Sequence, residues 1–137
     1  MNTVQDDTLQ KLEELDHYVD RTLKFFKKNL QGPVLEIGAG TGNITVELLE
    51  RGLDVLATEV HEERLQYLVS RVRAGCKPSW GKLKTTDLNL SNLDSKTIKK
   101  IQSQEPSGFG NIVAFNVLEH VEKDLDAVKA LREVLKP

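Results

Sequence analysis

Apolar residues recur every three or four positions along the first thirty residues of the chain. They form one stripe made of Leu12, Leu15, Val19, Leu23, Phe26 and Leu30. This spacing predicts a single amphipathic helix over residues 1–31, with polar and charged residues on its other face. The pair Gly32-Pro33 follows directly and is a typical helix stop.

After this helix, short apolar runs alternate with segments of helical spacing. Strands are predicted at residues 34–37, 55–57, 82–86 and 112–115. Helices are predicted between them, ending near Gly52 and Gly75, over residues 95–104, and along Leu125, Val128, Leu131 and Val134. Residues 105–111, which carry one proline and two glycines, are predicted to be a loop. Strands that alternate with helices predict an α/β fold with a parallel sheet and helices on both faces.

Composition narrows the class of protein. The 137 residues are 39% hydrophobic and 29% charged, which is typical of one globular domain and excludes a disordered or fibrous chain. A net charge of −2 argues against nucleic acid and acidic membranes as partners. No apolar stretch approaches the roughly 18 residues of a membrane span, and the polar start is unlike a signal peptide. The single cysteine, Cys76, excludes an internal disulfide and a cysteine-based zinc cluster, so we expect a cytoplasmic protein.

The most informative segment lies where the first strand gives way to a helix. It reads Glu36-Ile37-Gly38-Ala39-Gly40-Thr41-Gly42. Glycines there allow positive φ angles and a close approach of the backbone to a ligand. A dinucleotide fingerprint would need a third glycine at position 43, which is Asn43, and no Gly-Lys-Ser/Thr of a P-loop is present.

The pattern acid-x-Gly-x-Gly-x-Gly resembles motif I of the class I S-adenosylmethionine (SAM)-dependent methyltransferases. In that family this loop wraps the methionine and ribose portions of SAM. The resemblance implies that Glu36 faces the α-amino group of SAM, usually through water. It also implies that cofactor contacts come from Gly38, Ala39, Gly40 and Gly42.

Three further features follow in the order that this family has them. Glu59 ends the second strand, where a carboxylate can accept hydrogen bonds from both ribose hydroxyls. Asp87 follows the third strand, and the resemblance implies that it accepts a hydrogen bond from the adenine N6 amine while the Leu88 backbone N–H lies against the ring. The segment Asn116-Val117-Leu118-Glu119-His120 resembles motif IV in the "Leu-Glu-His" form that is common among small-molecule methyltransferases. The cofactor contacts implied in addition are Val60, Asn116 and Val117.

The resemblance also implies a fold: a Rossmann-like, doubly wound parallel sheet with strands 1–4 in the order 3-2-1-4. The family normally has seven strands, so strands five to seven are expected to be missing and the chain to be truncated at its C-terminus. Residues 1–31 are expected to form an N-terminal helical cap over the SAM site, with Tyr18 either against the methionine end or in the core. Residues 32–137 are expected to form the incomplete SAM-binding domain.

The expected function is transfer of a methyl group from SAM to a small molecule or a glycan or lipid precursor, leaving S-adenosylhomocysteine. His120 is the candidate general base for a hydroxyl or carbon acceptor; its alternative role is packing or hydrogen bonding at a helix start. No spacing of His, Asp and Glu suggests a metal site. A second hypothesis is an RNA adenine methyltransferase of the ribosomal dimethylase type, but that class has Asn-x-Pro-aromatic where this chain has Asn116-Val117-Leu118-Glu119. A third is a non-catalytic SAM-binding fragment that needs another chain.

The fourth strand also bears on partners. Residues 112–115 are apolar throughout, as in strands that are covered on both faces. In the order 3-2-1-4 this strand lies at a sheet edge, without the charge or proline that usually protects an edge. We therefore expect self-association, or pairing with a partner chain, through the fourth strand.

Overall fold

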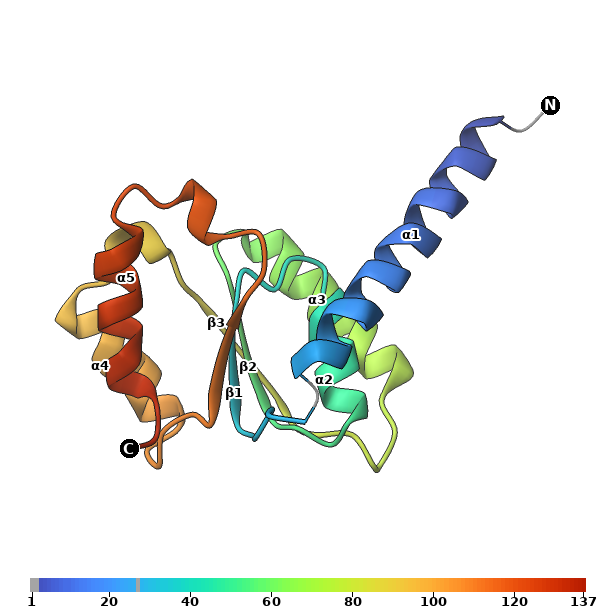
Figure 1. Ribbon diagram of the computed structural model, residues 1–137. Coiled ribbons are helices and arrows are strands. Elements are labelled where there is room, and N and C mark those ends of the chain that lie inside the picture. The colour runs from blue at the N-terminus through green and yellow to red at the C-terminus, as the bar shows by residue number, and fades with distance from the viewer. Residues whose placement is uncertain (1–2, 27) are drawn as a thin grey trace. The chain divides into compact units, whose positions relative to one another are not determined.

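The computed structural model describes residues 3–26 and 28–137, which form two compact units, residues 1–30 and 31–137 (Figure 1). The first unit is one helix, α1 (Thr3–Phe26), whose end is marked by the amide groups of Asn29 and Leu30 donating to the Phe26 carbonyl. The predicted helix over 1–31 is therefore a shorter helix followed by a turn. Residues 1, 2 and 27 of that prediction lie outside the described residues.

The second unit is built on one parallel sheet of four strands in the order β3-β2-β1-β4. The strands are β1 (Val34–Ile37), β2 (Val55–Glu59), β3 (Leu83–Asp87) and β4 (Asn111–Ala114). In the register, Val34 of β1 lies opposite Val55 on one side and Asn111 on the other. This confirms the predicted α/β class and the strand order 3-2-1-4.

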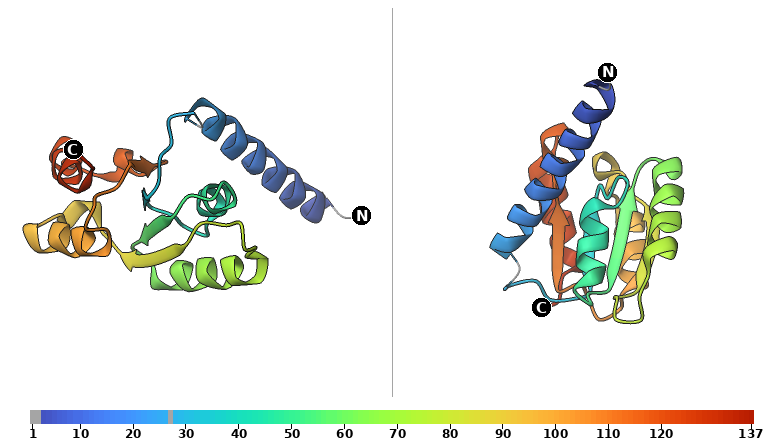
Figure 2. Two further views of the ribbon diagram at one scale, coloured as in Figure 1. Left: turned by 90° about the horizontal axis from the view of Figure 1, so that it is seen from below. Right: turned by 90° about the vertical axis from the view of Figure 1, so that its right-hand side faces the viewer.

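Helices cover both faces of this sheet, as Figures 1 and 2 show. Helices α2 (Asn43–Glu50) and α3 (Glu62–Gly75) lie on one face, and α4 (Ser95–Gln104) and α5 (Asp124–Leu131) on the other. Three short 3₁₀ helices, which the sequence pattern did not predict, occupy Leu90–Asn92, Leu118–His120 and Arg132–Val134. Because all neighbouring strands are parallel, the carboxyl ends of the four strands lie at one edge of the sheet. None of the described helices is long and apolar enough to cross a membrane.

The core between the sheet, α4 and α5 contains a residue that the sequence analysis placed in a loop. Phe109 is 1% exposed and packs with Leu35, Ile37 and Ile101. Its amide donates to the Val134 carbonyl, and its own carbonyl accepts from the Lys136 amide. Residues 105–110 are therefore a loop, as predicted, but Phe109 within it is buried in the core and Asn111 already belongs to β4.

The last helix differs from its prediction. Its buried residues are Ala127 and Leu131, while Leu125 and Val128 are 63% and 47% exposed. After Leu131 the backbone tightens into the 3₁₀ helix that buries Val134. The predicted apolar stripe thus divides between two faces, because a helix that packs through residues 127 and 131 turns residues 125 and 128 away from the sheet.

Candidate cofactor site

The glycine loop leaves β1 and enters α2 through three residues with positive φ. Gly38, Gly40 and Gly42 have φ angles of 70°, 57° and 94°. The end of β2 holds the loop, since the Ala39 amide donates to the Thr58 carbonyl at 2.8 Å and the Gly40 amide to Glu59 Oε2 at 2.9 Å. The loop is therefore fixed to the neighbouring strand before any ligand is considered.

The three glycines are needed for different reasons. An added Cβ on Gly38 would lie 2.5 Å from a methyl carbon of Val117, and one on Gly42 would lie 2.9 Å from Cγ of Leu68. These two glycines allow the loop to pack against its neighbours. An added Cβ on Gly40 would meet nothing within 4 Å. Only the middle glycine therefore faces open space.

Glu59 is 6% exposed and is surrounded by backbone donors. Oε1 accepts from the amides of Val60 at 3.0 Å and His61 at 3.2 Å, in addition to the Gly40 bond on Oε2. The guanidinium of Arg64 lies 3.8 Å from Oε1. These bonds hold an acceptor carboxylate at the carboxyl end of β2, and Oε2 keeps capacity for a further donor.

A cavity of about 290 Å³ opens over the carboxyl ends of the strands. The sequence-predicted residues that line it are Gly38, Gly40, Glu59, Val60, Leu88, Asn116, Val117 and His120. Residues that the sequence analysis missed also contribute to its wall: Arg64, Asn89, Leu90, Ser91, Phe115 and Val121. Residues 89–91 directly follow the predicted Leu88, and Phe115 and Val121 flank the predicted segment 116–120, so the sequence places them near the site without showing which face inward. No local signal indicates Arg64, which lies within α3.

The remaining predicted residues lie outside the lining of this cavity. Ala39 and Gly42 are buried in the loop itself, and Glu36 is buried in β1. The Asp87 side chain is 74% exposed and forms an ion pair of 2.7 Å with Lys100 of α4. This hydrogen bond and the lysine charge lower the pKa of Asp87. In this structure Asp87 thus faces a separate groove with Thr85 and Thr86, so its role at adenine stays a prediction.

Glu36 lies deeper than the loop that it precedes. It is 2% exposed, and its Oε2 accepts from the Thr45 hydroxyl of α2 at 2.6 Å. Burial raises the pKa of Glu36 to about 7, although the bond from Thr45 acts in the opposite direction. The carboxyl is therefore partly protonated near neutral pH.

This shift predicts a pH-dependent stability. Because the folded-state pKa is raised, the stabilisation is fully present below the unfolded value of 4.5 and is lost as pH rises through about 7. The free energy of unfolding should fall by about 3 kcal/mol across that window. Urea unfolding of Glu36→Gln should lack this loss, while the exposed Glu50→Gln should keep it. An unchanged pH profile in Glu36→Gln would assign the loss to other groups.

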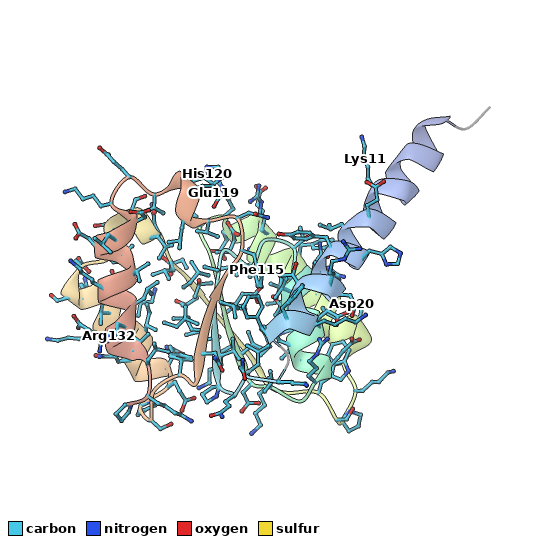
Figure 3. The ribbon with its side chains drawn as sticks, viewed as in Figure 1. Lys11, Asp20, Phe115, Glu119, His120 and Arg132 are labelled. Carbon is cyan, nitrogen blue, oxygen red and sulfur yellow. The ribbon has the colours of Figure 1, made fainter. Side chains whose placement is uncertain are left out.

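The segment after β4 forms the last wall of the cavity. Asn116 has a positive φ of 54°, which is uncommon outside glycine, and the 3₁₀ helix with Glu119 and His120 follows (Figure 3). Backbone in such sparsely populated regions often lies at functional sites. Here it turns the chain sharply over the end of β4.

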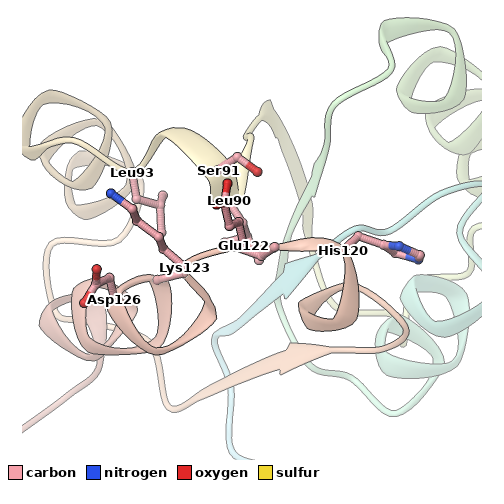
Figure 4. A pocket seen from close by; sticks show the side chains of 9 residues that line it. Leu90, Ser91, Leu93, His120, Glu122, Lys123 and Asp126 are labelled. Atoms are coloured by element: carbon pink, nitrogen blue, oxygen red, sulfur yellow. The ribbon is translucent and has the colours of Figure 1, made fainter.

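His120 lies between two cavities. It lines the cavity over the strand ends and also an adjoining cavity of about 460 Å³ between the first 3₁₀ helix and α5. Figure 4 shows its ring pointing away from Lys123 and Asp126, two of the charged residues of that second cavity. Among the described residues, no group of three or more His, Cys, Asp or Glu could hold a metal ion.

Comparison with known proteins decides the family. A family model described as "Methyltransferase domain" matches residues 35–137, which include the glycine loop, Glu59 and the segment after β4. The chain belongs to this methyltransferase family. An uncharacterized methyltransferase of Exiguobacterium sibiricum is 50% identical over 40 residues, which are 29% of this chain and 19% of that protein.

Solved methyltransferase structures share the fold. The glycopeptide N-methyltransferase MtfA, solved with SAM, superposes with a TM-score of 0.65 at 23% identity over 87% of this chain and 50% of that one. The CcbJ methyltransferase from Streptomyces caelestis gives 0.64 at 25% identity over 82% of this chain and 45% of that one. The methyltransferase chain described here thus spans at most half the length of these relatives.

Proposed function

We propose that the cavity over the strand ends binds SAM, and that the chain is the SAM-binding part of a methyltransferase that acts on a small molecule. The observation that carries this proposal is the convergence on one cavity of Gly40, the Glu59 carboxylate and the segment after β4. Each comes from a different strand end, where ligands of open α/β sheets bind.

The residues present fit such a cosubstrate. Gly40 leaves open space where any side chain would project, so a ligand can approach the backbone closely. Glu59 would offer an acceptor to the ribose hydroxyls, and Leu88, a buried apolar residue of the cavity wall, would lie against adenine. SAM supplies the methyl group, while these side chains hold and orient it and exclude water.

A small-molecule acceptor is favoured over RNA. The segment Asn116-Val117-Leu118-Glu119 has neither the proline nor the aromatic residue with which an RNA adenine methyltransferase stacks a flipped base. The net charge of −2 points in the same direction. His120 is the proposed base if the acceptor is a hydroxyl, because it lies on the wall shared by both cavities.

Calorimetry tests the binding step, and a labelled methyl donor tests the transfer. SAM and S-adenosylhomocysteine should bind with one site per chain, whereas NAD should not. Methyl-labelled SAM should then label a low-molecular-weight fraction of a lysate rather than its RNA. Binding without any transfer would support the alternative of a fragment that needs another chain, and label in RNA would favour the dimethylase hypothesis.

Glu59→Ala should weaken S-adenosylhomocysteine binding by about 1–3 kcal/mol, because the ribose hydroxyls would be buried without an acceptor. Titration calorimetry of the variant measures this difference. Glu63→Ala, an exposed carboxylate in the first turn of α3, is the matched control and should bind as the parent chain does. Equal affinity of Glu59→Ala and the parent would remove Glu59 from the site.

A further inference from the structure

The two halves of the glycine loop are held by different elements. The front half, Ala39 and Gly40, is bound to Thr58 and Glu59 at the end of β2. The rear half runs from Thr41 into α2, and Gly42 stands at its N-cap without a side-chain hydrogen bond to the helix. The Gly42 amide bonds within the loop to the Ala39 carbonyl, and a side chain of α3 connects the rear half to a second element.

Arg71 of α3 makes that connection. Its Nη1 donates to Asn43 Oδ1 at 2.6 Å and lies 3.3 Å from the Thr41 carbonyl, across 28 and 30 residues of sequence. Arg71 is half-buried as a residue, and Leu68, one turn earlier on α3, lies against Gly42. Arg71 and Leu68 of α3 thus both support the rear half of the loop.

We propose that Arg71 is a positioning residue for SAM binding: it holds Thr41 and Asn43 so that the loop keeps its left-handed conformation at Gly40 and Gly42. This inference rests on the proposed function, since it concerns the affinity of the same site. Arg71 is absent from the lining of the cavity, so it acts through the loop and not by touching the ligand.

The physical reason is preorganisation. A loop with three positive-φ residues has many alternative conformations, and ordering it on binding would lower affinity. A single guanidinium nitrogen, Nη1, donates to both acceptors from a rigid planar group, whereas a lysine ammonium is a flexible point charge. The contact with Asn43 therefore restricts the loop before the ligand arrives.

Calorimetric titration with S-adenosylhomocysteine tests the proposal. Arg71→Met should raise the Kd about tenfold, and Arg71→Lys about threefold, because the lysine side chain is one bond shorter and its ammonium is not held in a rigid plane. Asn43→Ala should also raise it about tenfold, and the double variant no further, as expected when both substitutions break one interaction. Arg73→Met, an exposed arginine on the same helix, is the matched control and should bind as the parent does.

A ligand-free measurement separates this proposal from the proposed function. Hydrogen exchange at the Gly42 and Val46 amides, which bond to the Ala39 and Gly42 carbonyls, should speed up in Arg71→Met and not in Arg73→Met. If the parent chain binds no S-adenosylhomocysteine, the proposed function fails while the exchange result still reports on the loop. Unchanged hydrogen exchange in Arg71→Met would overturn the role of Arg71. So would an Arg71→Met variant that binds S-adenosylhomocysteine as tightly as a parent chain that binds it.

Discussion

Gly40→Val should abolish binding of SAM and S-adenosylhomocysteine, with a Kd raised more than a hundredfold in calorimetry. An added Cβ at this position has no protein atom within 4 Å, so the side chain would occupy the space over the loop. The backbone φ of 57° also disfavours a β-branched residue. The variant therefore loses both the cavity and the loop conformation that shapes it.

A matched pair of alanine variants separates these two effects. Gly40 and Gly52 both have positive φ, of 57° and 79°, but Gly52 lies outside the cavity lining and an added Cβ there meets only the Ser79 carbonyl oxygen at 3.7 Å. Each Gly→Ala change should cost roughly 1–2 kcal/mol of stability. Only Gly40→Ala should also weaken binding. Normal affinity in both Gly40→Ala and Gly40→Val would mean that the ligand does not lie over this loop.

The sequence predicts the framework of this site well because the framework is local. Residues 34–37 form β1 as expected, and the helix at residues 95–104 has its predicted bounds. Alternation of strand and helix requires crossovers, and crossovers bring the strand ends to one edge. Glu59 and Gly40 follow from that rule, since each is defined by its place at a strand end.

The rest depends on contacts between distant segments, which one sequence does not reveal. Asp87 lies outside the cavity because an edge strand leaves its side chain free to reach Lys100, thirteen residues later. Phe109 is buried because Leu135 forms a bridge with it, although its own neighbours are loop formers. Arg71 is one arginine among several on α3, and only folding brings it to Asn43.

The two edges of the sheet differ in how they are protected. On the β3 edge the Lys84 ammonium donates to the Gln104 carbonyl at 2.7 Å, and Lys100 bonds Asp87 at the same distance. Charged side chains and the neighbouring α4 thus hinder another strand from pairing with that edge. The β4 edge carries Ile112, Val113 and Ala114, all only partly buried. No charged side chain interrupts this apolar run.

The backbone hydrogen bonds of β4 also leave its outer edge open. The Gly110 amide donates to the Pro33 carbonyl, on the side of β1. Phe109 bonds on the opposite side, where its amide donates to the Val134 carbonyl and its carbonyl accepts from the Lys136 amide. Successive residues of a strand alternate between its two sides, so the amides of Asn111 and Val113 face outward. Among the described residues, an isolated bridge to Leu135 pairs Phe109, just before β4, on this outer side.

We therefore expect the 137-residue chain to self-associate through the outer edge of β4, so that its weight-average mass at least doubles between about 1 and 100 µM in sedimentation. Val113→Pro should shift the chain toward monomer, because it removes an outward amide and spares the ladder to β1. Thr85→Pro makes the equivalent change on the lysine-guarded β3 edge and should leave association unchanged. Far-UV circular dichroism should first show that both variants are folded.

A parent chain that sediments as a monomer at all concentrations would mean that the β4 edge is covered. Equal effects of Val113→Pro and Thr85→Pro on association would place the contact elsewhere.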